Sequence, residues 1–264
     1  MGRTIKPDWI NTILWISSVL IFLFIYVPMI VVVIYSFNGE AVNSFPITSW
    51  SVKWYAVLLH DAALLNALKN SIIVAFFGTL IGLLLGIPAA FAVDRFRFPG
   101  KVVFERIVLL PMILPGIITG VALMSVFVMF RIDLSLFTIL IGHGTFLIAV
   151  VMTQVYARLK RIDRSIEEAS MDLGASRLKT FFLVTLPIIK TAVIGATLLS
   201  ITLSLDEIAV SYFLTGRSLT LPVQIWAMLR RGITPEVNAI STLIFVFSVI
   251  MIVIVTRLSR EDAD

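Results

Sequence analysis

SIEEASMDLGASRLKTFFLVTLP, from Ser165 to Pro187, is a polar and amphipathic island between two long apolar segments. Ser165, followed three residues later by Glu168, has the spacing of a capping box, which marks the start of a helix. Small and apolar side chains then recur at the spacing of one helix face, at Ile166, Ala169, Ser170 and Leu173. The remaining face carries Glu167, Glu168, Met171 and Asp172. These patterns predict a short amphipathic helix whose small face another protein could approach closely.

The following residues predict where this helix ends and where the chain enters the membrane. Gly174 can adopt the positive φ at which a helix stops, and Ser176 can cap a second short helix. Pro187 marks the start of the next apolar segment. A connector resting on lipid headgroups is the alternative, but such a helix favours large apolar residues and a basic polar face. The small residues and acids found here favour a docking element over residues 163–187.

The composition is that of an integral membrane protein. Of the 264 residues, 59% are hydrophobic and only 14% are charged, and the mean hydropathy is +1.04. A soluble globular protein is about 45–50% apolar. Cysteine is absent, which excludes a disulfide framework and a thiolate metal site.

Apolar segments long enough to cross a bilayer, which takes about 20 residues, predict an all-α protein with a single transmembrane domain over residues 1–264. We expect six spans, at residues 10–36, 71–93, 107–130, 134–156, 188–214 and 239–256. A cleaved signal peptide is the competing interpretation of the first segment. Its apolar core would be about 7–15 residues long with an A-x-A-like exit, so we expect a retained helix.

Basic residues are divided unevenly between the two sides that these spans define. Both termini lie on one side, and of the 21 Lys and Arg residues only six lie on the other: Lys53, Lys69, Arg131, Arg217, Arg230 and Arg231. Cytoplasmic connections carry the excess of Lys and Arg. The distribution therefore predicts that both termini and segment 163–187 are cytoplasmic.

The polar island also carries a recognisable signature. E-A-S-x-x-x-G from Glu168 to Gly174, followed after nine residues by V-T-L-P, resembles the E-A-A-x-x-x-G-(x9)-I-x-L-P signature of the permease subunits of binding-protein-dependent ABC importers. In that family this loop is the coupling helix, which inserts into a groove of a cytoplasmic ATPase and transmits its closure to the membrane helices. The resemblance implies the type I ABC importer permease fold. It also implies ATPase-coupling contacts by Glu168, Ala169, Ser170, Asp172, Leu173 and Gly174.

Two adjacent acids, Asp206 and Glu207, lie in the outer half of the predicted span 188–214. Intramembrane acids usually face the bundle interior or a water-filled path. The nearest basic residues along the chain, Lys190 and Arg217, lie at the two ends of the span, so neither can neutralise them from this helix. The acids would suit a passing cation, above all one with two or more amines. Alternatively, they mark the outer helix end, satisfy a kink or pair with an Arg of a partner subunit.

Longer motifs around these acids resemble the second permease subunit of spermidine/putrescine importers. They are L-S-L-D-E-I-x-V-S-x-F-x-x-G at 203–216, L-P-x-x-I at 221–225 and P-E-V-N-A-x-x-T at 235–242. The resemblance implies a polyamine path that includes Asp206, Glu207, Ser204 and Ser211.

The same resemblance implies partners and a location. The partners are a second permease subunit, two cytoplasmic ATPase subunits that bind ATP and Mg²⁺, and a periplasmic or extracellular polyamine-binding protein. The location is the inner membrane of a bacterium. A heterodimer of permeases is expected, although a homodimer would satisfy the same features.

Other classes of function have less support in the residues. The chain has no G-x-x-x-x-G-K-[ST] motif, and we expect it to bind no nucleotide, cofactor, metal or nucleic acid. A membrane enzyme would need a nucleophile with a base, or a metal cluster, yet His60 and His143 are isolated. We expect His143 to pack or hydrogen-bond near the start of the fourth span. A channel or an ion-driven carrier stays open if Asp206 or Glu207 titrates as a coupling site.

Overall fold

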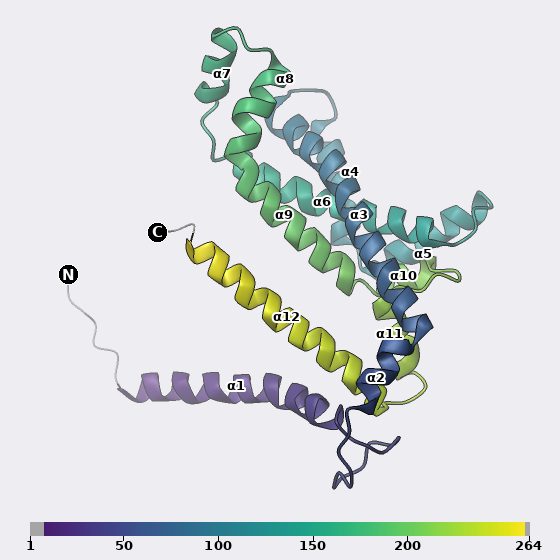
Figure 1. Cartoon of the computed structure of the whole chain (residues 1–264). Helices are drawn as coiled ribbons and strands as arrows, with labels where there is room; N and C mark the ends of the chain where they lie inside the picture. Colours follow the sequence, from purple (N-terminus) through teal and green to yellow (C-terminus); the bar gives the residue numbers. More distant parts are fainter. Residues whose placement is uncertain (1–7, 262–264) are drawn as a thin grey trace. The chain divides into compact units, whose positions relative to one another are not determined.

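The computed structural model describes the backbone of residues 8–261 and the side chains of residues 9–250, and within this range every regular element is a helix (Figure 1). The chain forms two compact units, Met1–Ala62 with Ile225–Asp264, and Ala63–Gln224. Arg3 and Lys6, together with the side chains of Arg257 and Arg260, which contribute to the predicted orientation, lie outside the described residues.

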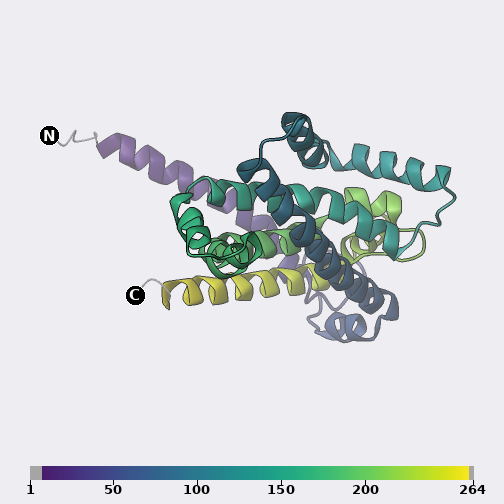
Figure 2. The same ribbon diagram turned by 90° about the horizontal axis from the view of Figure 1, so that it is seen from above.

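The first unit is built on three helices, α1 (Asp8–Tyr35), α2 (Lys53–His60) and α12 (Pro235–Glu261). α1 packs along α12, and α12 packs against α2. The apolar window of α1 has none of its residues buried inside the chain, so this surface is free to face lipid or another subunit. α12 is a single straight helix in both views (Figures 1 and 2).

The second unit holds the remaining helices and the predicted docking element. Its elements are α3 (Ala62–Arg95), α4 (Lys101–Ile113), α5 (Gly116–Met129), α6 (Leu136–Leu159), α7 (Ser165–Asp172), α8 (Arg177–Thr180), the π-helical turn η1 (Phe181–Thr185), α9 (Leu186–Asp206) and α10 (Ala209–Leu214). α11 (Leu221–Leu229) connects the two units along the sequence.

α6 is the central helix of the second unit. One core cluster joins it to α3 and α9 through Val93, Val155 and Ile189, all fully buried. A second cluster joins it to α3, α5 and α10 through buried side chains that include Ile139 and Leu214. α3 approaches α6 closely because it presents glycines there; a Cβ at Gly86 would lie 2.8 Å from the carbonyl oxygen of Ile148. Small residues at such positions let two membrane helices pack backbone to backbone.

Two of the predicted spans are interrupted. Residues 107–130 form α4 and α5, which meet at Leu114 and Pro115 with a bend of 108°. Leu114 is extended, as a residue before proline tends to be, so the helix cannot continue through it. Residues 188–214 form α9 and α10, separated at Glu207.

The other spans correspond to α1, α3, α6 and α12. Among the described residues, four helices are long and apolar enough to cross a membrane, and five if α4 and α5 count as one span. Pro235–Ile250 of α12 is a shorter apolar stretch. The chain is therefore a multi-pass, all-α membrane protein.

Candidate functional site

The start of α7 differs from the prediction. Its N-cap is Arg164, whose side chain makes no capping bond. Asp163 instead accepts a hydrogen bond from the Ser165 amide, with 3.0 Å between Oδ1 and N. This bond, followed by one from the Ser165 side chain, lowers the pKa of Asp163. The predicted capping box of Ser165 and Glu168 is therefore wrong. The Ser165 amide donates to Asp163 in place of the Glu168 carboxylate, and the Glu168 amide donates to the carbonyl of Arg164 in place of the Ser165 hydroxyl.

The end of α7 matches the prediction. Gly174 has φ +89°, in the left-handed region that glycine adopts without strain. Its amide donates to the carbonyl of Met171, and the Ala175 amide donates to the carbonyl of Ser170. These two bonds form a Schellman motif, which satisfies the last carbonyls of the helix. Ser176 then caps α8 by accepting from the Lys179 amide at 3.3 Å, as predicted.

Most of the predicted coupling residues lie on an accessible surface. Glu168, Ala169, Asp172, Leu173 and Gly174 are all exposed. Leu173, beside the turn, is 90% exposed, more than any other large apolar side chain among the described residues. It is therefore accessible to another protein.

Ser170 is the exception among these residues, because it faces its own chain. Its hydroxyl lies 3.1 Å from that of Thr180, which is buried at the end of α8. The hydrogen bond fastens α7 to α8 across the Gly174 turn. The structure thus gives Ser170 an internal contact that the sequence pattern did not predict.

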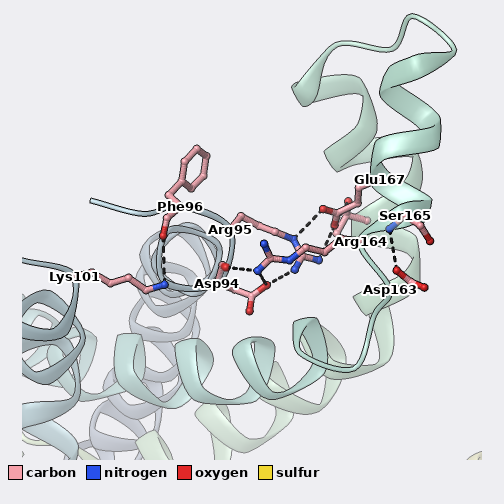
Figure 3. Close-up of polar contacts among 9 residues, drawn as sticks. Asp94, Arg95, Phe96, Lys101, Asp163, Arg164, Ser165 and Glu167 are labelled. Carbon is pink, nitrogen blue, oxygen red and sulfur yellow. Dashed lines mark hydrogen bonds and ion pairs between the residues drawn. The ribbon is translucent and has the colours of Figure 1, made fainter. Parts of the chain in front are cut away.

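Glu167 is the residue of this element that sequence reasoning missed. We predicted it on the polar face of the helix, but its carboxylate is turned toward Arg95 at the end of α3 (Figure 3). Arg95 donates from Nε to Oε2 at 2.9 Å and from Nη2 to Oε1 at 3.0 Å. Thr185 of η1 donates to Oε1 at 3.1 Å. One carboxylate therefore joins α7 to two other elements, α3 and η1.

Two further charged side chains complete this cluster. Asp94 pairs with Arg95, and Arg164 donates to the Asp94 carbonyl at 2.7 Å (Figure 3). The side chains of Asp94, Arg95 and Glu167 are only 6%, 11% and 12% exposed. Two acids and two bases make the cluster neutral overall. No feature of the helix itself predicts this contact, because the partner of Glu167 lies 72 residues away.

A continuous helix leads from this cluster into the membrane. α8, η1 and α9 run without a break from Arg177 to Asp206, so the predicted start of a span at Pro187 lies inside a longer helix. Proline has no amide to donate to the carbonyl four residues earlier. The wider π turn precedes it, and there the Leu186 amide donates to the carbonyl of Phe181, five residues back. Turns of this kind interrupt the regular ladder without ending the helix.

The continuous helix ends at the two predicted acids. Asp206 is its last residue and is exposed, and Glu207 has extended backbone with ψ 109°. Glu207 Oε1 accepts a hydrogen bond from the Val210 amide at 2.8 Å, which caps α10. The same oxygen also lies against the start of α5, since a Cβ at Gly116, the first residue of that helix, would be 3.3 Å from it. The N-terminal end of a helix dipole is positive, so it favours the negative charge of Glu207.

His143 connects the two helices on either side of the break through hydrogen bonds. This residue of α6 is fully buried, and its Nδ1 and Nε2 lie 2.7 Å and 2.8 Å from the hydroxyls of Ser204 and Ser211. A neutral imidazole donates through one nitrogen and accepts through the other. The ring therefore bridges the last turn of α9 and α10, and our expectation that His143 packs or hydrogen-bonds near the start of the fourth span is confirmed. Both predicted path serines are held by it.

No group of three or more His, Cys, Asp or Glu side chains that could hold a metal ion occurs in the described part of the chain. The described contacts connect α7, which is exposed, through α8 and η1 to the helix that ends at Asp206 and Glu207.

Comparisons with known proteins agree on one family. Residues 78–261 match the family described as "Binding-protein-dependent transport system inner membrane component". The putrescine transport system permease protein PotI of Escherichia coli K12 is 39% identical over 91% of this chain and 86% of its own length. The spermidine/putrescine transport system permease protein PotC of the same strain is 34% identical, over 91% of each chain. The PotC protein of Haemophilus influenzae is 33% identical, over 92% and 94%.

Solved structures agree on the fold. One chain of a bacterial ABC transporter that imports the acidic polysaccharide alginate superposes with a TM-score of 0.71 at 22% identity, over 99% of both chains. A chain of an alginate transporter in complex with its periplasmic protein gives a TM-score of 0.73 at 15% identity, over 96% and 95%. The predicted ABC importer permease fold is therefore confirmed.

Proposed function

We propose, from the premise that the chain belongs to the family of binding-protein-dependent transport system inner membrane components, that it is a permease subunit of an ATP-driven polyamine importer. Its relatives are transport permeases, not enzymes, and their names give putrescine and spermidine as the transported compounds. Its two compact units act as one transmembrane domain in the bacterial inner membrane, with both termini in the cytoplasm.

α7 is the coupling helix in this proposal. The ATPase contacts are Glu168, Ala169, Ser170, Asp172, Leu173 and Gly174, and all of these except Ser170 are exposed. The positive-inside distribution supports a cytoplasmic location for this helix. Closure of the ATPase around ATP and Mg²⁺ moves α7, while the permease itself binds neither.

The polyamine path runs past the break between α9 and α10. Asp206 is exposed there and Glu207 is partly exposed, so both carboxylates are available to a cation. Ser204 and Ser211 flank the same break, with their hydroxyls on His143. Breaks in membrane helices commonly form transporter binding sites, where irregular backbone borders a water-filled cavity. A linear diamine or triamine can place one positive charge near each of two neighbouring carboxylates, which a cation with a single charge cannot do.

The observation that carries the proposal is one helix, from Arg177 to Asp206, that joins the turn beside α7 to the acids. A force applied at the cytoplasmic end of this helix reaches the path without an intervening loop. Around this chain we propose a second permease subunit, two ATPase subunits and an external polyamine-binding protein that delivers the cargo.

Uptake by the reconstituted complex tests the function. Proteoliposomes that contain this chain, its partner permease and the ATPase, with ATP inside and the binding protein outside, should accumulate labelled putrescine or spermidine. Competition by arginine, choline and potassium measures selectivity for polyamines. ATP-dependent uptake of a different solute without polyamine uptake would retain the importer and refute the cargo, whereas uptake that needs an ion gradient and no ATP would support an ion-driven carrier.

A further inference from the structure

The contacts of Glu167 single it out among the acids of the cytoplasmic element. Arg95 binds it with two hydrogen bonds, at 2.9 and 3.0 Å, in the bidentate geometry that fixes both position and orientation. Both side chains are nearly nine-tenths buried. An exposed ion pair contributes little to stability because water and salt screen it. Removal of one partner from a buried pair is costly, because the other charge is then left buried without a partner.

Three elements meet at this one carboxylate. Arg95 is the last residue of α3, Glu167 lies in the first turn of α7, and Thr185 belongs to η1, directly before α9. Thr185 is itself buried, and it donates to the same Oε1 that accepts from Arg95. Displacement of α7 therefore pulls on the ends of two long helices through a single group.

The alternative attachments of α7 are weaker or reach fewer elements. Arg164 contacts Asp94 of α3, but its side chain is 55% exposed. The Ser170 to Thr180 hydrogen bond joins α7 to α8 and does not reach α3. Glu167 alone links α7 to both α3 and the helix that continues to Asp206, among the hydrogen bonds described above.

The adjacent Glu168 provides a contrast. It has the same side chain one position later, yet it is exposed on the surface proposed to meet the ATPase. Glu168 thus points outward, whereas Glu167 points into the chain toward Arg95 (Figure 3).

We propose that Glu167 is a positioning residue that converts the motion of α7 into a joint displacement of α3 and α9, while Glu168 serves docking of the ATPase. This inference rests on the proposed coupling function. Without the Glu167 carboxylate, the ATPase still binds α7 and hydrolyses ATP, and α7 stays attached to α9 through the Ser170 to Thr180 bond and α8, but its motion no longer carries α3 along with α9. The predicted defect is loss of transport per ATP hydrolysed, not loss of assembly.

The experiment compares Glu167→Gln with Glu168→Gln in the complete reconstituted complex, with Asp133→Asn, an exposed acid in the connection between α5 and α6, as the neutral control. Three quantities are measured: ATPase co-purification, ATP hydrolysis and solute uptake. We expect E167Q to lower uptake per ATP roughly tenfold or more, as loss of a charged hydrogen-bond pair predicts, with co-purification unchanged. E168Q should instead weaken co-purification.

A second pair of variants separates coupling from folding. Arg95→Lys keeps the charge but not the bidentate geometry, so it should restore part of the coupling that Arg95→Met loses. In each variant, thermal unfolding in detergent shows whether the fold is retained. Equal uptake per ATP in E167Q and wild type would overturn the inference, and so would a loss of co-purification in E167Q as large as in E168Q.

A cargo-independent readout distinguishes failure of this inference from failure of the proposed function. The chain has no cysteine, so spin labels can be attached at Met171→Cys on α7 and at Leu85→Cys, an exposed position on α3, in the assembled complex. We expect a narrow distance distribution in the wild-type background, with and without ATP, and a broad one with E167Q. Equally narrow distributions in both overturn the positioning role, whatever solute the complex carries.

Discussion

Ser170 on α7 and Thr180 on α8 face each other across the Gly174 turn, with their hydroxyl oxygens 3.1 Å apart. Because the chain has no cysteine, Ser170→Cys with Thr180→Cys would create the only thiol pair in it. A disulfide needs Cβ atoms about 3.5–4.5 Å apart, which side chains in hydrogen-bond contact approach. We expect mild oxidation to form the bond and ATP-driven uptake to persist, because α7 and α8 move as one body.

Uptake by the double variant is compared before and after reduction, with each single cysteine variant as a control for the loss of a hydroxyl. If oxidation stops uptake and reduction restores it, α7 must move relative to α8 during transport, and the rigid connection is refuted.

Substitution of Gly174 should strain the backbone of the turn, although a side chain at this position would meet no neighbouring atom. A Cβ at this position meets no atom within 4 Å, but φ is +89°. An L-residue in the left-handed region costs about 1–2 kcal/mol, and Asn is tolerated best. Gly174→Val should therefore weaken ATPase co-purification and uptake, and Gly174→Asn should retain most of both.

Gly100 provides the matched control, because it has φ +80° and equally open surroundings at the start of α4. Gly100→Val carries similar strain away from the docking surface. A comparable loss of ATPase binding in both valine variants would assign the effect to general destabilisation.

The two acids at the helix break should differ in their response to neutralisation. Asp206→Asn removes a charge without removing a hydrogen bond described in the chain. Glu207→Gln removes the charge but leaves an oxygen that can accept from the Val210 amide, whereas Glu207→Ala also uncaps α10. We expect both isosteric variants to lower polyamine uptake about tenfold, as loss of a charged contact predicts. Glu207→Ala should lower thermal stability as well.

Asp133→Asn again serves as the control for loss of an exposed acid. Uptake kinetics are measured with saturating binding protein, so that delivery does not limit the rate. Normal uptake in both isosteric variants would remove the acids from the path.

His143 should contribute to stability through its two serine contacts. His143→Ala leaves a cavity and two buried hydroxyls, on Ser204 and Ser211, without their described partner. We expect a loss of about 2–4 kcal/mol in the free energy of unfolding, measured by denaturant titration in detergent. His60→Ala, at an exposed histidine, should change it by about 0.5 kcal/mol or less. Equal effects of the two substitutions would contradict a structural bridge at His143.

Sequence reasoning succeeded where local rules decide the structure. The helix, the stop at Gly174 and the cap at Ser176 depend on residues close together in the chain, and all three are found. The apolar segments likewise identify the membrane helices, because burial in lipid requires long apolar runs.

Apart from the start of α7, where the neighbouring Asp163 replaced the predicted capping box, it failed where a distant residue competes. Glu167 turns inward because Arg95, 72 residues away, offers it two donors. Ser204 and Ser211 are engaged by His143 from another helix, 61 and 68 residues away. Helical spacing alone cannot rank such partners, because it contains no information on which helix lies opposite. The break at Glu207 was left as one alternative for the two acids for a related reason, since apolar residues continue on both sides of it.

The uninterrupted helix from Arg177 to Asp206 has a mechanical consequence. Its 30 residues, at about 1.5 Å each, make a lever arm roughly 45 Å long. A tilt of only about 5° at the Arg177 end would sweep the carboxylate of Asp206 through about 4 Å. In the proposed importer, a small angular movement at α7 would therefore be amplified into a displacement of the acids by roughly the width of a thin, flexible cation.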